Sequence, residues 1–261
     1  MNLEHVLILL VLGFVAGGVG ALAGIGGGII ITPILAIYLG VPMHQAIGIS
    51  LTAVIATSTA TSSVYVEKGL SNIRLGMTLE MATTIGAAIA AIIAGFVDRK
   101  TLAILFSVFM LYTAASLVKK AWDSRHQKVE TEIPPYEVRR LPAGLGASLV
   151  AGGLSGLLGI GGGPIKVPIM FLFMGVPLRV ATATSNFMIG VTAATSAYIY
   201  YGRGDIPLLY AGPIVVGVFA GSLISARLAS KVKTTYILFL LIFVTLYLAI
   251  NMLWKVWGGK F

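Results

Sequence analysis

A glycine-rich motif occurs twice in the chain, and both copies lie within segments that are apolar enough to cross a membrane. The first copy runs from Gly24 to Pro33 (GIGGGIIITP) and the second from Gly159 to Pro168 (GIGGGPIKVP). Three consecutive glycines with a proline close behind disfavour a continuous helix. In a lipid bilayer, backbone that leaves the helix must be buried in protein or must line a cavity. We therefore expect two broken helices, and matching breaks in two related halves indicate the binding site of a transporter.

Composition predicts an integral membrane protein. Hydrophobic residues make up 57% of the 261 residues and charged residues only 10%, against about 25% in a soluble domain. Cysteine is absent and the three histidines are far apart in the sequence, so we predict no metal site and no cofactor. The glycine motifs depart from the nucleotide-binding patterns, and no histidine base for a serine hydrolase follows His126. We predict that the protein is not an enzyme.

The apolar runs match the ~20 residues that a spanning helix needs. In repeat 1, residues 1–118, we expect a broken helix at 3–39 and helices at 44–66, 75–97 and 101–121, the last running just past the repeat. Residues 119–140 are polar and predict a linker loop. In repeat 2, residues 141–261, we expect a broken helix at 141–174 and helices at 178–201, 207–229 and 234–257. The predicted fold is an all-α polytopic membrane protein of two homologous repeats, each with a broken or re-entrant helix and about three transmembrane helices.

The two halves match without gaps. Gly24 and Gly159 lie 135 residues apart, and the same interval pairs Ser50 with Ser185 and many other residues. Such self-similarity indicates an internal duplication. The repeats are inverted if each broken segment is re-entrant, and parallel if each one crosses fully. The distribution of lysine and arginine favours the inverted arrangement, and it puts the 119–140 loop in the cytoplasm in either case.

The doubled glycine-rich break followed by proline, the small-residue helix after it and the polar central loop resemble the sulfite exporter TauE/SafE family of transporters. The resemblance rests on Gly24 to Pro33 and Gly159 to Pro168 with their flanks, and it covers almost the whole chain. It implies a secondary transporter in a prokaryotic cytoplasmic membrane that moves small anionic sulfur compounds, such as sulfite, sulfoacetate or related organosulfonates. A carrier or channel for another small anion, such as a carboxylate, is the alternative.

An oxyanion that leaves water at mid-membrane needs hydrogen-bond donors and positive potential, and helix N-termini offer both. The glycines of the breaks are therefore candidates for substrate binding: Gly26, Gly27, Gly28, Gly161, Gly162 and Gly163. Lys166 is the one full charge within a broken segment, and charges inside a bilayer are usually functional. Its ammonium could bind the substrate anion, pair with a carboxylate such as Glu80, or extend to the membrane interface.

Three polar residues on the helices that follow the breaks are further candidates for anion binding. Ser50 and Ser185 are related by the repeat, and Asn186 carries an amide that can donate two hydrogen bonds. The other hydroxyl residues of these helices are expected to serve helix packing.

The expected partners are the small anionic substrate and membrane lipid, with no nucleic acid. Glycine pairs four residues apart, such as Gly13/Gly17 and Gly217/Gly221, predict helix contacts within the chain, with a homodimer as the alternative. Energy coupling stays open. Glu80 is the strongest intramembrane candidate for proton coupling, whereas an uncoupled anion would leave a negative-inside cell down the membrane potential.

Overall fold

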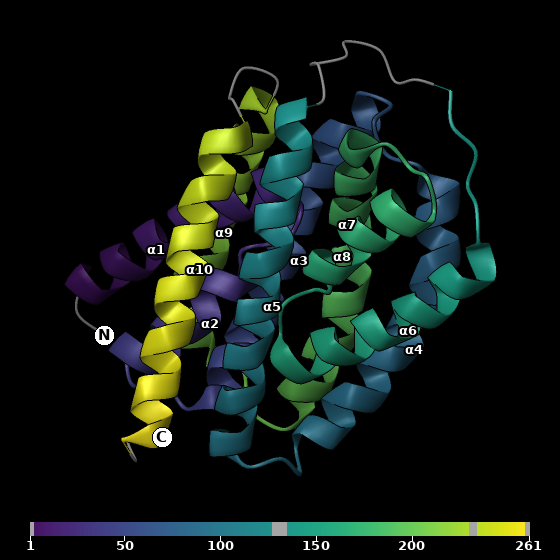
Figure 1. The fold of residues 1–261 in the computed structure, drawn as a ribbon. Coiled ribbons are helices and arrows are strands. Elements are labelled where there is room, and N and C mark those ends of the chain that lie inside the picture. The colour runs from purple at the N-terminus through teal and green to yellow at the C-terminus, as the bar shows by residue number, and fades with distance from the viewer. Residues whose placement is uncertain (1–2, 127–134, 230–233, 259–261) are drawn as a thin grey trace.

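The computed structural model describes residues 3–126, 135–229 and 234–258, and the regular structure within them is helical (Figure 1). The first half contains α1 (Leu3–Ala23), α2 (Gly28–Tyr38), α3 (Met43–Glu67), α4 (Ile73–Ala94) and α5 (Arg99–His126). The second half contains α6 (Leu141–Leu158), α7 (Gly163–Pro168), the π-helix η1 (Ile169–Phe173), α8 (Leu178–Gly202), α9 (Leu208–Leu228) and α10 (Thr234–Trp257). Seven helices of the described part are long and apolar enough to span a membrane. The predicted all-α polytopic membrane fold is thereby confirmed.

Both glycine motifs interrupt a helix, the first between α1 and α2 and the second between α6 and α7. Gly24 and Gly26 have φ of +74°, and their counterparts Gly159 and Gly161 have φ of +72° and +74°. This left-handed region is open to glycine at little cost but strains residues with a Cβ. The glycines thus supply the backbone conformation that ends one helix and lets the next begin a few residues later in a new direction.

The helices of one half pack mainly against those of the other. α1 packs against α9, α4 against α6, α5 against α10, and α3 against α8; Figure 1 shows α5 and α10 side by side, with α4 and α6 together at the right. Gly48 near the start of α3 contacts Asp205 just after α8, whereas Ser58 farther along α3 contacts Asn186 in the first half of α8. The two corresponding helices α3 and α8 therefore run antiparallel, as inverted repeats require. The placement of each half in the bilayer stays a prediction.

Glycines allow the paired helices to approach until their backbones touch. A Cβ at Gly152 of α6 would collide with the carbonyl oxygen of Thr83 in α4, and one at Gly217 of α9 would collide with that of Leu10 in α1. In lipid there is little hydrophobic force between helices, so close van der Waals packing of this kind stabilises the bundle. The seams at Gly13/Gly17 and Gly217/Gly221 are filled within the chain, so a homodimer stays a prediction that needs another surface.

The helix α5 is longer than expected. It continues to His126, so residues 119–126 are helical and do not belong to a loop that begins at 119. Lysine and alanine at positions 119–121 have high helix propensity, which lets the helix continue beyond the apolar span. Residues 127–134 of the predicted linker lie outside the described residues. From 135 onward the chain returns to the bundle, where the Asn72 side-chain amide donates to the Tyr136 hydroxyl at 2.9 Å.

Alanine at Gly152 should destabilise the protein, because the new methyl group would meet the α4 backbone, which cannot move aside locally. Overpacking of this kind costs about 1–3 kcal/mol. Gly146, on the same helix, faces open space, and alanine there should be neutral or slightly stabilising through its higher helix propensity. Thermal unfolding of the two purified variants in detergent measures the difference. Equal midpoints would show that the α4–α6 backbone contact does not stabilise the fold.

Single cysteines report the topology cleanly, because the chain contains no cysteine of its own. A Cβ added at Gly202, at the end of α8, would have no neighbour within 4 Å, so Gly202→Cys is tolerated. Inverted repeats with a cytoplasmic linker put residue 202 outside, and a membrane-impermeant maleimide should label it in intact cells. Lys100→Cys should be labelled and Lys68→Cys should not, in either arrangement. Labelling of residue 202 only after permeabilisation would contradict the inverted arrangement and the antiparallel course of α3 and α8.

Candidate functional site

The two breaks contact each other at the centre of the bundle. A Cβ at Gly28 would lie 2.7 Å from the carbonyl oxygen of Gly159, and one at Gly163 would lie 2.5 Å from that of Gly24. These two contacts are equivalent under the 135-residue interval. Any larger residue at 28 or 163 would push the breaks apart. Glycine is therefore required at these positions by the close approach of two backbones.

Ser50 and Ser185 make reciprocal hydrogen bonds across this contact. The Ser50 hydroxyl in α3 donates to the carbonyl oxygen of Gly159 at 2.7 Å, and the Ser185 hydroxyl in α8 donates to that of Gly24 at 3.2 Å. Each serine thus holds the break of the opposite half. Both hydroxyls are fully buried, and their protons are directed to backbone carbonyls. Their predicted role as donors to an anion stays a prediction, because it requires that these bonds be exchanged.

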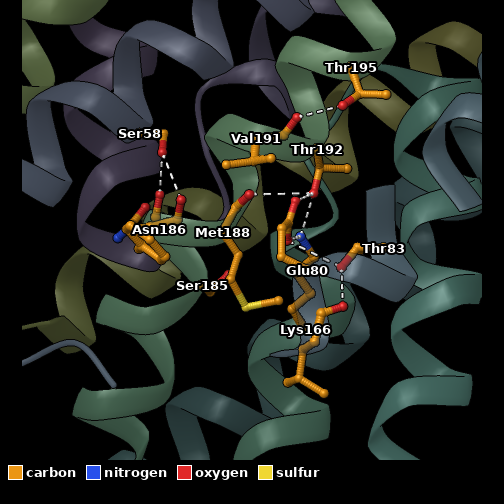
Figure 2. Close-up of polar contacts among 12 residues, drawn as sticks. Ser58, Glu80, Thr83, Lys166, Ser185, Asn186, Met188, Val191, Thr192 and Thr195 are labelled. Carbon is orange, nitrogen blue, oxygen red and sulfur yellow. Dashed lines mark hydrogen bonds and ion pairs between the residues drawn. The ribbon is translucent and has the colours of Figure 1, made fainter. Parts of the chain in front are cut away.

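Asn186 lies beside Ser185 and also contacts the first break. Its side-chain Nδ2 donates to the carbonyl oxygen of Ala21 near the end of α1 at 3.1 Å. Its backbone carbonyl accepts from the Ser58 hydroxyl at 2.6 Å, and Figure 2 shows Ser58 above it. The side-chain Oδ1 is buried without a hydrogen-bond partner among the described residues. A buried amide oxygen normally has a partner, so this side chain has spare capacity next to the break.

Lys166 of α7 forms a buried ion pair with Glu80 of α4. Its Nζ lies 3.0 Å from Glu80 Oε2 and 2.7 Å from the Thr192 hydroxyl of α8. The Thr192 hydroxyl in turn donates to Glu80 Oε1, and the Thr83 hydroxyl lies 3.2 Å from Oε2. Figure 2 shows these four side chains meeting from three helices. The side chains of Lys166 and Glu80 are 0% and 7% exposed, so Lys166 does not extend to the membrane interface.

The ion pair also adjoins the second break. The Cε of Lys166 would lie 3.3 Å from a Cβ at Gly162, so the aliphatic part of the lysine covers that glycine. The structure therefore brings together Lys166 and the second break, which contains the candidate residues Gly161, Gly162 and Gly163. A removal of either charge would leave its partner buried and uncompensated, which typically costs about 3–5 kcal/mol.

The polar cluster has no counterpart in the other half. At the equivalent positions, 135 residues away, Ile31 replaces Lys166, Val215 replaces Glu80 and only Thr57 matches Thr192. The Thr57 hydroxyl donates to its own helix, to the carbonyl oxygen of Ala53 at 3.1 Å. The two halves thus share the breaks and the serines but differ in charge.

Thr192 and Thr83 are members of the cluster that the sequence did not single out. Thr192 belongs to a helix with many small hydroxyl residues, and nothing in its local sequence distinguishes it from Thr195, whose hydroxyl only bonds back to Val191. The signal that would have found it is tertiary: α4, α7 and α8 meet at this point.

Two hollows of different size adjoin these elements. A pocket of about 410 Å³ lies at the start of α4, lined by Gly69, Leu70, Ser71, Asn72, Ile73, Tyr136 and Val180. A much smaller space of about 20 Å³ lies between the two breaks and α5, next to Ile25 and Pro164. The smaller one has room for about one water molecule. The breaks are therefore packed closed, and a solute larger than a water molecule would need the halves to move apart at this point.

No cluster of potential metal ligands occurs among the residues that the structure describes. The buried charge and the polar groups around the breaks suit the binding of a small charged solute in a protein interior.

Comparison with known proteins agrees with this architecture. The chain matches the model of the family described as "Sulfite exporter TauE/SafE" over residues 9–252. It is 29% identical to the "Probable membrane transporter protein YunE" of Bacillus subtilis (strain 168), over 95% of this chain and 97% of that protein. It is 28% identical to the "Probable membrane transporter protein MJ0441" of Methanocaldococcus jannaschii, over 86% of this chain and 88% of that protein.

A plant relative is similar over a shorter region. The "Sulfite exporter TauE/SafE family protein 3" of Arabidopsis thaliana is 34% identical over 98 residues, which are 36% of this chain and 20% of that protein. No solved structure matches the chain. The family match covers both glycine breaks and nearly all of the described helices, so the chain is a multi-pass membrane protein that belongs to the sulfite exporter TauE/SafE family of membrane transporters.

Proposed function

We propose that the protein is a carrier for small anionic sulfur compounds, namely sulfite, sulfoacetate or related organosulfonates, and that the substrate binds between the two breaks. The observation that carries this proposal is the direct contact of the breaks, with a buried lysine against one of them. The membership of the sulfite exporter family supports the chemical class of the substrate.

The breaks offer an anion hydrogen-bond donors and positive potential, which replace the hydration water that it loses on binding. The first N–H groups of α2 have no partner within that helix, and the helix dipole adds positive potential there. The chain enters the short helix α7 at Gly163, although Pro164 has no N–H to donate there. Because the glycines lack a Cβ, an oxyanion can approach the backbone closely. Lys166 adds a full positive charge and three N–H donors.

Transport requires that the closed contact open and re-form. The hydrogen bonds of Ser50 and Ser185 join the breaks of opposite halves, so separation of the halves releases both hydroxyls. The two serine hydroxyls can then donate hydrogen bonds to the oxygens of a bound sulfonate, as can the side-chain amide of Asn186. Exchange of carbonyl partners for substrate oxygens offsets the loss of the closed contacts. Alternate separation on either side of the membrane gives alternating access around a fixed site.

A flux assay tests the proposed function. The full-length protein is reconstituted into liposomes, and uptake of sulfite, sulfoacetate, methanesulfonate, taurine and acetate is compared with uptake by protein-free liposomes. We expect saturable flux of at least one sulfur oxyanion and competition among those that are transported. Saturable flux of acetate alone would replace the substrate class with carboxylates. Non-saturating flux would indicate a channel, and absence of flux with every anion would contradict the proposal.

Removal of the Lys166 charge should weaken anion binding by at least about tenfold, since a buried charge pair is worth more than 1.4 kcal/mol. Lys166→Met alone would leave Glu80 buried without its partner, so the informative variant is the double substitution Lys166→Met/Glu80→Gln, which removes both charges at nearly constant shape. Lys100→Met, at an exposed position, is the control. Isothermal titration calorimetry with methanesulfonate measures the affinity. A folded double variant with the affinity of the control would remove Lys166 from the site.

A further inference from the structure

We propose that Glu80 is the proton-binding site of this carrier: it closes the anion subsite at Lys166 as an internal counterion, and it must take up a proton before a substrate anion can replace it. This inference rests on the proposed function and adds the coupling ion to it. One proton then moves with each substrate monoanion.

Glu80 and Lys166 are an isolated pair of charges. Among the side chains that the structure describes, Glu80 is the one buried carboxylate and Lys166 the one buried cation. Their contacts account for most of their hydrogen-bonding capacity: Lys166 donates to Glu80 and Thr192, and Glu80 accepts from Lys166, Thr192 and Thr83. In the closed structure, the carboxylate of Glu80 occupies the place at the ammonium that a substrate anion would take.

The charge balance of the site decides what substrate binding requires. With Glu80 ionised and Lys166 protonated, the pair has no net charge. Addition of a monoanion would leave one uncompensated negative charge in a medium of low dielectric constant, which is strongly unfavourable. Uptake of one proton on a Glu80 carboxylate oxygen restores neutrality, while the ammonium keeps its three protons and turns one N–H toward the anion. Proton and anion therefore bind together.

The surroundings of Glu80 can accommodate both protonation states. The hydroxyls of Thr83 and Thr192 can donate to the carboxylate, and each can accept from the carboxylic acid. Thr83 also has the carbonyl oxygen of Leu79 as a partner at 2.8 Å, and Thr192 has that of Met188 at 3.4 Å. Each threonine can therefore redirect its own proton to its helix when Glu80 is protonated.

No second titratable group among the described residues is in a position to take the place of Glu80. α6 and η1, which adjoin the cluster, contain no titratable side chain. On α8, Arg179 lies in the first turn and the tyrosines near the last turns, and Tyr112 of α5 is exposed. Along α4 itself, Arg74 lies in the first turn, while Arg203 and His44 contact carbonyls near its end, about three to four turns from Glu80.

The larger pocket lies at the end of α4 that is closer to Glu80, and we infer that the proton enters or leaves the site there. This pocket is lined by Asn72 and Ile73 at the start of α4, about two helical turns from Glu80 on the same helix. The buried hydroxyl of Ser71 at this pocket has no hydrogen-bond partner among the described residues. The polar residues of this pocket are thus at the N-terminal end of α4, which is the end of the helix closer to Glu80.

Methanesulfonate is the appropriate probe, because it stays a monoanion across the working pH range and any pH effect then belongs to the protein. In liposomes with the full-length protein, a pH difference of one unit, acid outside, should drive its accumulation to about tenfold. A membrane potential of 100 mV should have little effect, since proton and anion move together. Uncoupled anion movement would instead respond to that potential by about 50-fold.

Glu80→Gln should separate binding from coupling. Its neutral amide mimics the protonated acid, so methanesulfonate affinity should no longer fall as the pH rises, whereas in the unaltered protein it should fall by up to about tenfold per pH unit. Accumulation driven by the pH difference should disappear, although counterflow of labelled against unlabelled methanesulfonate continues. Glu67→Gln, at an exposed end of α3, is the matched control and should keep the original pH dependence.

The outcomes distinguish this inference from the proposed function. Saturable methanesulfonate flux that ignores the pH difference, or a Glu80→Gln protein with the original pH dependence, would overturn the role of Glu80 and leave the carrier function intact. Absence of saturable flux with every anion would overturn both. If Glu80→Gln fails to fold, Glu80→Gln/Lys166→Met restores charge balance, and it should bind weakly at every pH; a steep pH dependence in that variant would assign the proton to another group.

Discussion

Backbone contact between two interrupted helices determines the rest of this structure. In a bilayer, a broken helix is tolerated only where protein covers the freed backbone groups, and here each break is covered by the other. Gly28 lies against Gly159, Gly163 lies against Gly24, and two serines join the breaks from opposite halves. The long helices around them pack in pairs that also join one half to the other. Most of the major helix interfaces thus lie between the two halves.

On this nearly symmetric frame, the ion pair of Glu80 and Lys166 is an asymmetric feature. Burial of two charges is expensive, and an apolar pair of similar volume is often at least as stable. In the opposite half, Val215 stands at the position equivalent to Glu80 and Ile31 at the position equivalent to Lys166. This fold therefore accommodates apolar residues at such positions. Stability alone therefore gives little reason for the charges. Binding of a solute whose charge must be balanced in the protein interior does give a reason for the buried charges. This reason links the ion pair to transport.

Much of the fold could be predicted from the sequence, because its strongest signals are local. The glycine runs determine where the helices break, the apolar runs determine where they span, and the resemblance to the TauE/SafE family is confirmed by the family match. The predicted end of α5 was wrong by several residues, because polar residues of high helix propensity carry a helix beyond the apolar layer. The roles of the candidate site residues stay predictions, and the sequence could indicate where these residues lie but not what they contact. Ser50 and Ser185 lie at the breaks, but their carbonyl partners come from the other half and leave no trace in the local sequence. Pairing of Lys166 with Glu80 was one of three alternatives, and the packing of both α4 and α7 on α8 selects it.

The position of the bound anion is the most direct test of the central claim, and anomalous diffraction from crystals grown with selenite, a heavier analogue of sulfite, would locate it. The account predicts a selenium peak between the two breaks, within hydrogen-bond distance of backbone N–H groups of both and of Lys166, with the Gly28–Gly159 contact opened. A peak in any other place, with the two breaks still in contact, would contradict it.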